Sequence, residues 1–172
     1  MSDLRTQLRH CLTGRVCVVG VGNPDRGDDA FGPALAAALA DRGVAPVIVA
    51  GSTPEHCLGR IERTDADTVL FLDATDFGAA PGAVGLFDRD EIAARHPQIS
   101  THHLSLGLLA GMLEQDGRRR VWLLGVQPAQ LRWAAELSAP VRRTADLLAD
   151  LLTETLAPAA APAETLEPLA RL

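Results

Sequence analysis

The stretch from Val16 to Gly32, VCVVGVGNPDRGDDAFG, constrains the fold more than any other part of the chain. Its apolar run VCVV is short, rich in β-branched residues and bounded by Gly20, which is typical of a strand buried on both faces. Two acids, Asp28 and Asp29, follow the glycine loop and stand just before an alanine-rich helical segment. This order predicts an open α/β sheet, in which binding sites gather at the carboxyl ends of the strands.

Apolar runs and helical patterns alternate along the rest of the chain. No helical pattern separates the run at 68–73 from the run at 83–88, which predicts an antiparallel strand at the edge of the sheet. The predicted fold class is a three-layer α/β sandwich, with a mostly parallel, twisted sheet of about five strands and helices on both faces. We expect strands at 16–19, 46–50, 68–73, 83–88 and 121–126, and helices at 1–14, 29–42, 54–63, 90–96, 104–113 and 139–156.

With 172 residues, the chain is expected to form a single domain over residues 1–156, of which residues 1–14 are an N-terminal helix. Residues 157–172 are rich in Pro and Ala, lack a packing pattern and are predicted to be a flexible tail. The three cysteines form no C-x-x-C pair, which indicates reduced thiols. Without a signal-peptide pattern or a membrane-length apolar run, we expect a cytoplasmic protein that contacts no membrane.

The charge of the chain argues against one class of partner. The net charge is −6, and all 16 basic residues are arginine. Nucleic-acid binding depends on clustered cations, so we expect no nucleic-acid partner. The absence of lysine excludes a P-loop lysine and every Schiff-base mechanism. We expect a monomer with a transient peptide or protein partner.

Acidic and imidazole side chains are predicted to meet at one edge of the sheet. Asp28 and Asp29 follow the first strand, Asp73 ends the third, and His102 and His103 precede the last strand by one helix. If the first and third strands are neighbours, two carboxylates and one imidazole provide an open ligand set for a divalent transition metal. Structural alternatives stay open: a helix cap for Asp28, which we prefer, an Asx-turn for Asp73, and polar first-turn residues for the histidines.

Five motifs stand in order along the chain: GVGNPDRGDDAFG at 20–32, GSTPE at 51–55, DATDFG at 73–78, STHHL at 100–104 and LGVQP at 124–128. Together they resemble the hydrogenase maturation endopeptidases, which process the large subunit of nickel-iron hydrogenases. GSTPE and LGVQP are most similar to the branch that serves formate-hydrogenlyase-type hydrogenases. The resemblance extends from Arg15 to Leu156 and implies the same sandwich fold.

The resemblance also implies a metal site. In that family the nickel meets the second acid of the D-D or D-E pair, the acid of the D-A pair and the first histidine of the S/T-x-H segment. These positions fall on Asp29, Asp73 and His102, and the resemblance makes Asp29 and Asp73 the catalytic carboxylates. The nickel is implied to arrive with the substrate, so the isolated protein need not contain it. The doubled histidine leaves open whether His103 shares or replaces the role of His102.

The activity implied by the resemblance is that of an aspartic-type, metal-dependent endopeptidase. It would remove a C-terminal extension from the nickel-loaded precursor of a nickel-iron hydrogenase large subunit. Two alternatives stay open: a peptidyl-tRNA hydrolase, which also has a strand followed by G-x-G-N-P, and a metal-sensing chaperone that holds the precursor without cutting it. A peptidyl-tRNA hydrolase would need a histidine soon after the glycine loop, where this chain has Asp28 and Asp29.

Overall fold

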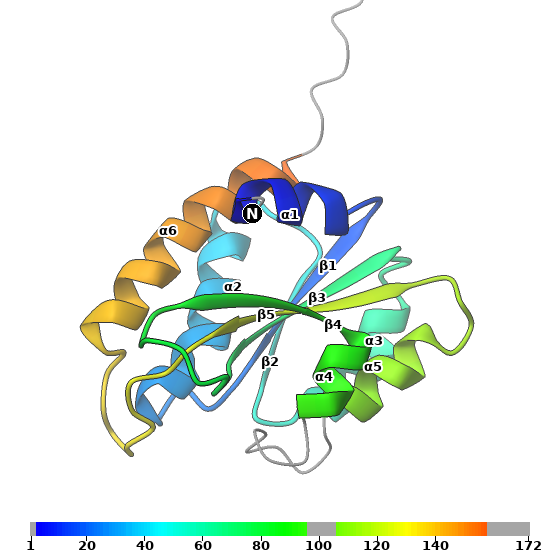
Figure 1. Cartoon of the computed structure of the whole chain (residues 1–172). Helices are drawn as coiled ribbons and strands as arrows, with labels where there is room; N and C mark the ends of the chain where they lie inside the picture. Colours follow the sequence, from blue (N-terminus) through cyan, green and yellow to red (C-terminus); the bar gives the residue numbers. More distant parts are fainter. Residues whose placement is uncertain (1–2, 96–105, 158–172) are drawn as a thin grey trace, which may run out of the picture.

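The computed structural model describes residues 3–95 and 106–157, which form one five-stranded sheet with helices on both faces (Figure 1). The strands are β1 (Val16–Val21), β2 (Val47–Gly51), β3 (Thr68–Ala74), β4 (Val84–Asp88) and β5 (Arg120–Val126). Their order in the sheet is β2-β1-β3-β5-β4. All neighbouring pairs are parallel except β4 and β5, which pair antiparallel at the edge.

Helices cover the sheet in two layers. They are α1 (Leu4–Cys11), η1 (Gly27–Ala30), α2 (Phe31–Asp41), η2 (Pro54–Cys57), α3 (Leu58–Glu62), α4 (Arg89–Arg95), α5 (Leu106–Glu114) and α6 (Ala139–Leu156), where η marks a 3-10 helix. Buried side chains of α1, α2 and α6 pack on one face of the sheet. Those of α3, α4 and α5 pack on the other.

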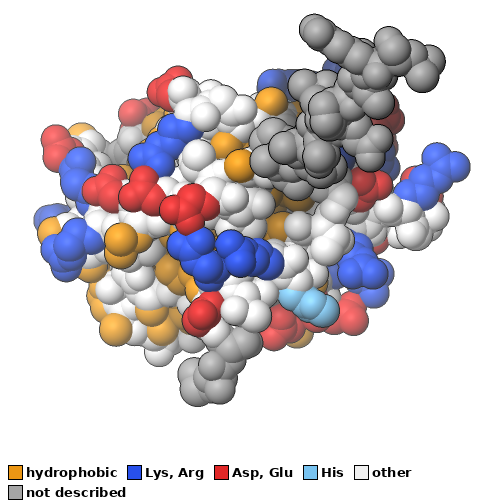
Figure 2. All heavy atoms as spheres, turned by 90° about the horizontal axis from the view of Figure 1, so that it is seen from above, with side chains coloured by type: hydrophobic (Ala, Val, Ile, Leu, Met, Phe, Trp, Pro, Cys, Tyr) orange, Lys and Arg blue, Asp and Glu red, His pale blue; other side chains and the backbone are white. Residues whose placement is uncertain are grey.

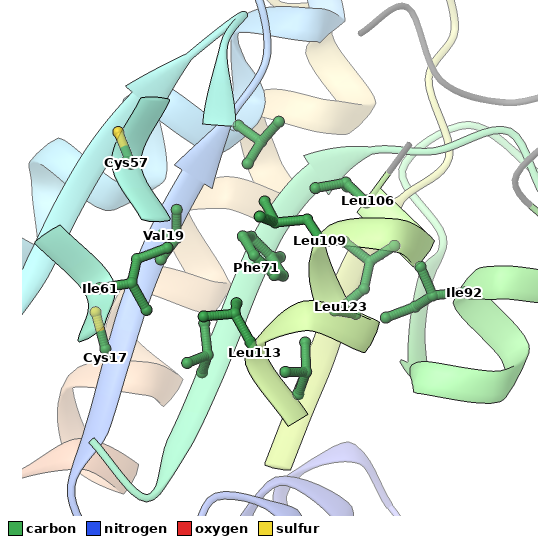
Figure 3. Packing of buried hydrophobic residues seen from close by; sticks show 14 of the residues in the cluster. Cys17, Val19, Cys57, Ile61, Phe71, Ile92, Leu106, Leu109, Leu113 and Leu123 are labelled. Atoms are coloured by element: carbon green, nitrogen blue, oxygen red, sulfur yellow. The ribbon is translucent and has the colours of Figure 1, made fainter. Parts of the chain in front are cut away.

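Side chains of the central strands alternate between the two faces, because successive residues of a strand point in opposite directions. Val18 and Leu70 belong to the core under α2 and α6. Val19 and Phe71 belong to the core under α3 and α5, where Figure 3 shows Phe71 beside Leu109 of α5. The central strands are therefore apolar on both faces, which explains their uninterrupted apolar runs in the sequence.

This architecture confirms the predicted sandwich, its mostly parallel sheet and its antiparallel edge strand. The predicted helix start near Asp29 is confirmed in part, because a 3-10 turn comes first and α2 begins at Phe31. Pro33 lies in the first turn of α2, where its missing N–H has no helical partner to lose. The three cysteines are free and buried, in agreement with the prediction of reduced thiols.

The surface carries charges of both signs. Figure 2 shows acidic and basic side chains next to one another on the face seen from above, rather than a single basic patch. Within residues 3–95 and 106–157, no helix is long and apolar enough to cross a bilayer. Of the predicted tail, residues 157–172, only Ala157 is described, so its flexibility stays a prediction.

Candidate functional site

Two glycines allow η1 to lie directly on the carboxyl ends of β1 and β3. A Cβ on Gly22, whose φ is 132°, would lie 2.0 Å from the carbonyl oxygen of Asp29. A Cβ on Gly32 would lie 2.1 Å from the carbonyl oxygen of Val21 and 2.2 Å from that of Leu72. No side chain tolerates such contacts, so glycine at both positions brings the acids of η1 against the sheet.

Asp29 is almost completely buried and lacks hydrogen-bond donors for part of its carboxylate. Its side chain belongs to η1 and is 2% exposed. Its Oδ2 is buried and accepts no hydrogen bond from the part of the chain that the structure describes. In the same residues no salt bridge reaches Asp29. A buried oxygen without a donor costs free energy, because the hydrogen bonds it made to water are not replaced.

Asp73 lies at the same edge of the sheet. It is the penultimate residue of β3, between the parallel neighbours β1 and β5, and is 4% exposed. η1 contacts β3, so Asp29 and Asp73 come from segments that touch. By the alternation of β3, Asp73 shares its face of the sheet with Phe71, the face that α3 and α5 cover. The structure thus places both predicted catalytic acids, buried, at the carboxyl edge.

Asp28 has a structural role instead. Its Oδ1 accepts a hydrogen bond from the backbone N–H of Ser138 at 2.6 Å. Its Oδ2 accepts from the N–H groups of Ala129 and Gln130 at 2.8 and 3.1 Å and from the Ser138 hydroxyl at 2.9 Å. Ser138 is the N-cap of α6, so a negative charge here also favours the helix dipole. We predicted a helix cap, but the helix is α6 and not α2, whose N-cap Ala30 has no side-chain bond.

Gln127 connects the end of β5 to the loop after β3 by side-chain hydrogen bonds. Its Oε1 accepts from the N–H groups of Phe77 and Ala79 at 2.9 and 3.1 Å, and its Nε2 donates to Asp76 Oδ1 at 3.0 Å. The Gln127 side chain, followed by the N–H of Gly78, holds the pKa of Asp76 below the ordinary carboxyl value. These bonds fix the loop after β3 to the end of β5.

The predicted metal site includes residues that the structure does not describe. His102 and His103 lie outside the described residues. Among residues 3–95 and 106–157, no group of three or more His, Cys, Asp or Glu side chains is placed to hold a metal ion. The ligand set of Asp29, Asp73 and His102 therefore stays a prediction, with its two carboxylates at one edge of the sheet.

Sequence reasoning missed two features of this edge. One is the pair of Gln127 and Asp76, which are far apart in sequence. The other is Trp133, whose ring lies 5.8 Å from the guanidinium carbon of Arg26. An isolated tryptophan in the segment between the last strand and the last helix is the signal in the sequence that points to the second feature.

Two solved structures of similar fold are hydrogenase maturation peptidases. The [NiFe] hydrogenase maturation protease HycI from Thermococcus kodakarensis KOD1 matches with a TM-score of 0.78 and 32% identity, over 87% of this chain and 98% of that one. The hydrogenase maturating endopeptidase HybD from E. coli matches with a TM-score of 0.68 and 26% identity, over 81% and 90%. The fold is thus that of the peptidases that mature hydrogenases.

Sequence comparison gives the family. The hydrogenase 3 maturation protease of Escherichia coli K12 is 36% identical over 124 residues, 71% of this chain and 78% of that protein. The family model described as "HycI: Hydrogenase maturation protease" matches residues 32–155. The chain belongs to the hydrogenase maturation protease family, a family of peptidases. This confirms the resemblance found in the sequence motifs and disfavours the peptidyl-tRNA hydrolase alternative.

Proposed function

We propose that this chain is an endopeptidase that removes a C-terminal extension from the nickel-loaded large-subunit precursor of a nickel-iron hydrogenase. Its family membership supports a peptidase that acts in hydrogenase maturation. The observation that carries the proposal is the buried Oδ2 of Asp29, which has no hydrogen-bond donor among the described residues. A ligand or a reacting group that meets this oxygen would supply the missing partner.

The proposed role of nickel is that of a feature of the substrate. Two carboxylates and one imidazole suit a divalent transition metal, and Asp29 and Asp73 provide the carboxylates. We propose His102 as the imidazole. It precedes α5 in the chain. That helix packs on the sheet face that Asp73 shares and leads into β5, which places its first residue, Leu106, towards the carboxyl edge. A precursor that carries nickel would complete the ligand set, and one without nickel would not.

The proposed reaction is hydrolysis of one peptide bond. One of the two carboxylates orients a water molecule and takes its proton as the oxygen attacks the scissile carbonyl. Nickel carried by the precursor would polarise that carbonyl as a Lewis acid. When the C–N bond breaks, the proton passes to the leaving amine. Burial of Asp29 and Asp73 strengthens these electrostatic effects, because less water is present to screen them.

The test uses the purified chain and the nickel-loaded large-subunit precursor of a nickel-iron hydrogenase from the same organism. Mass spectrometry of the precursor is expected to show one shorter product. Asp29→Asn, Asp73→Asn and His102→Ala should each slow its formation by about 100-fold or more, the order of magnitude expected for loss of a catalytic acid or base. Nickel-free precursor should stay intact.

Asp67→Asn is a matched control. Asp67 precedes β3 at the opposite end of the strand from Asp73, is exposed and accepts a hydrogen bond from the N–H of Arg15. This variant should process the precursor at the wild-type rate. Binding of the precursor without any shortening would favour the non-cleaving chaperone instead. Normal processing by Asp29→Asn and Asp73→Asn would contradict the assigned site.

A further inference from the structure

The segment between β5 and α6 exposes a large aromatic side chain at the carboxyl edge. We call residues 127–138 the Trp133 loop. Trp133 is 69% exposed and is the largest of the exposed hydrophobic side chains among the described residues. Tryptophan on a surface is a common anchor of protein interfaces, because its ring offers a large contact area with few rotatable bonds.

The Trp133 loop lacks regular structure but is held at many points. The carboxylate of Asp28 accepts hydrogen bonds from both ends of the loop, as described above. Backbone bonds add to this: Ala134 N–H donates to Asp25 O at 2.8 Å, and Gly27 N–H donates to Ala135 O at 3.1 Å. The indole is therefore presented on a preorganised support, which lowers the entropy cost of binding.

Residues 25–27, which contact the Trp133 loop, lie just before Asp29 in the chain. Arg26, whose guanidinium lies against the Trp133 ring, accepts a hydrogen bond at its carbonyl oxygen from the N–H of Asp29 at 3.1 Å. The guanidinium occupies one face of the ring, and the large exposed fraction leaves the rest of the ring open to a partner. An extended peptide advances about 3.3 Å per residue, so a segment whose scissile bond lies at Asp29 reaches the indole within a few residues.

We propose that Trp133 is a docking and specificity residue, which receives an apolar side chain of the precursor within a few residues of the scissile bond. This inference rests on the proposed function, because it takes the precursor as the partner. Its chemistry follows from the open indole face, which is apolar and carries no charge of its own. The contact is made in the bound precursor before and during the reaction, so Trp133 contributes to binding and not to the chemical step.

The test compares Trp133→Ala with the wild type on the nickel-loaded precursor. KM should rise about tenfold or more, the effect of losing an interface anchor. The value of kcat should stay within about twofold, because the lost contact stabilises the bound precursor and the transition state equally. Trp133→Phe, which keeps an aromatic ring, should recover most of the wild-type KM. The thermal unfolding midpoint of both variants should equal that of the wild type, because the side chain is mostly exposed.

Leu147→Ala is the matched control. Leu147 is 71% exposed in the middle of α6, about 13 Å along the helix from Ser138. Its truncation should leave KM and kcat unchanged. An unchanged KM in Trp133→Ala, or a fall in kcat alone, would overturn the inference. If the wild type binds the precursor but does not cleave it, the proposed function fails, and the Kd of Trp133→Ala still decides the docking role. If the wild type does not bind the precursor, both are overturned.

Discussion

The two ends of the sheet treat their acidic side chains differently. At the amino end of β3, Asp67 is exposed and accepts a hydrogen bond from the N–H of Arg15 at 2.8 Å. At the carboxyl end of the same strand Asp73 is 4% exposed, and Asp29 in the neighbouring η1 is 2% exposed. Asp67 at the amino end is therefore in contact with water, whereas Asp73 and Asp29 at the carboxyl end are buried.

Within the carboxyl end, the adjacent acids Asp28 and Asp29 differ in how their buried oxygens are paired. A buried polar atom without a partner costs about 1–3 kcal/mol, a sizeable part of the roughly 5–15 kcal/mol that stabilises a typical domain. Asp28 avoids the cost through its hydrogen bonds to the Trp133 loop, but Oδ2 of Asp29 does not within the described residues. Because functional sites often sacrifice stability, Asp29 is a better candidate than Asp28 for a catalytic role in a peptidase.

The largest expected loss of stability comes from a substitution at Gly32, where α2 packs directly on the backbone of β1 and β3. Gly32→Ala would put a Cβ 2.1 Å from the carbonyl oxygen of Val21 and 2.2 Å from that of Leu72. Both are backbone atoms of the central strands, so α2 must move away from the sheet. We expect a loss of about 3 kcal/mol or more, measured by urea unfolding.

Gly111→Ala is the control for the effect of replacing a helical glycine by alanine where no close contact is made. Gly111 lies in α5, and a Cβ there meets nothing within 4 Å. Because alanine favours a helix over glycine by about 1 kcal/mol, this variant should be as stable as the wild type or more so. Equal losses in the two variants would contradict the claim that the carboxyl edge depends on backbone contact at Gly32.

A matched pair of substitutions tests the difference between the adjacent acids. Asp28→Asn places an NH₂ group against the N–H donors of the Trp133 loop, and should cost about 2–4 kcal/mol. Asp29→Asn removes a buried charge without losing a hydrogen bond at Oδ2, so its stability should match or exceed that of the wild type by up to about 1 kcal/mol. Urea unfolding measures both. If Asp29→Asn were the less stable variant, Asp29 would have the structural role that we assign to Asp28.

The fold was largely predictable because its signals are local. Short apolar runs separated by helical patterns predict the alternating elements, and the missing helix between β3 and β4 predicts the antiparallel edge. The helix start was displaced because the 3-10 turn at Gly27–Ala30 has no apolar periodicity of its own. Pro33 still limited that error to a single turn.

The catalytic and metal-binding roles of Asp29 and Asp73 stay predictions, but the position of both acids at one edge of the sheet could be predicted from the strand pattern. Asp29 and Asp73 follow apolar runs, and the register of β1 with β3 brings them to one edge. The partner of Asp28 was not predictable, since Ser138 lies 110 residues further along the chain and no pattern links them. The same holds for Trp133 and Arg26, whose contact depends on how two loops meet.

The Asp76 carboxylate gives a smaller, pH-dependent effect. Hydrogen bonds from Gln127 and Gly78 hold its pKa below the ordinary value of 3.8. A carboxyl whose pKa is lowered on folding stabilises the native state above the unfolded pKa, and this contribution is lost as the pH falls through the folded value. Asp76→Asn should thus lower the thermal midpoint slightly near neutral pH. The difference from the wild type should shrink below pH 3.8; a constant difference would contradict the lowered pKa.

The smallest effect is expected from an exposed ion pair near the amino end of the sheet. Arg42, at the C-terminus of α2, and Asp150 of α6 lie 2.7 Å apart, with side chains 40% and 68% exposed. Water screens such a pair, so a double-mutant cycle of Arg42→Met and Asp150→Asn should give a coupling of about 0.2–1 kcal/mol. Coupling should fall further in 1 M salt, where screening acts over about 3 Å. A coupling as large as the Asp28→Asn effect would show that charges at the amino end are as tightly built into the fold as those at the carboxyl end.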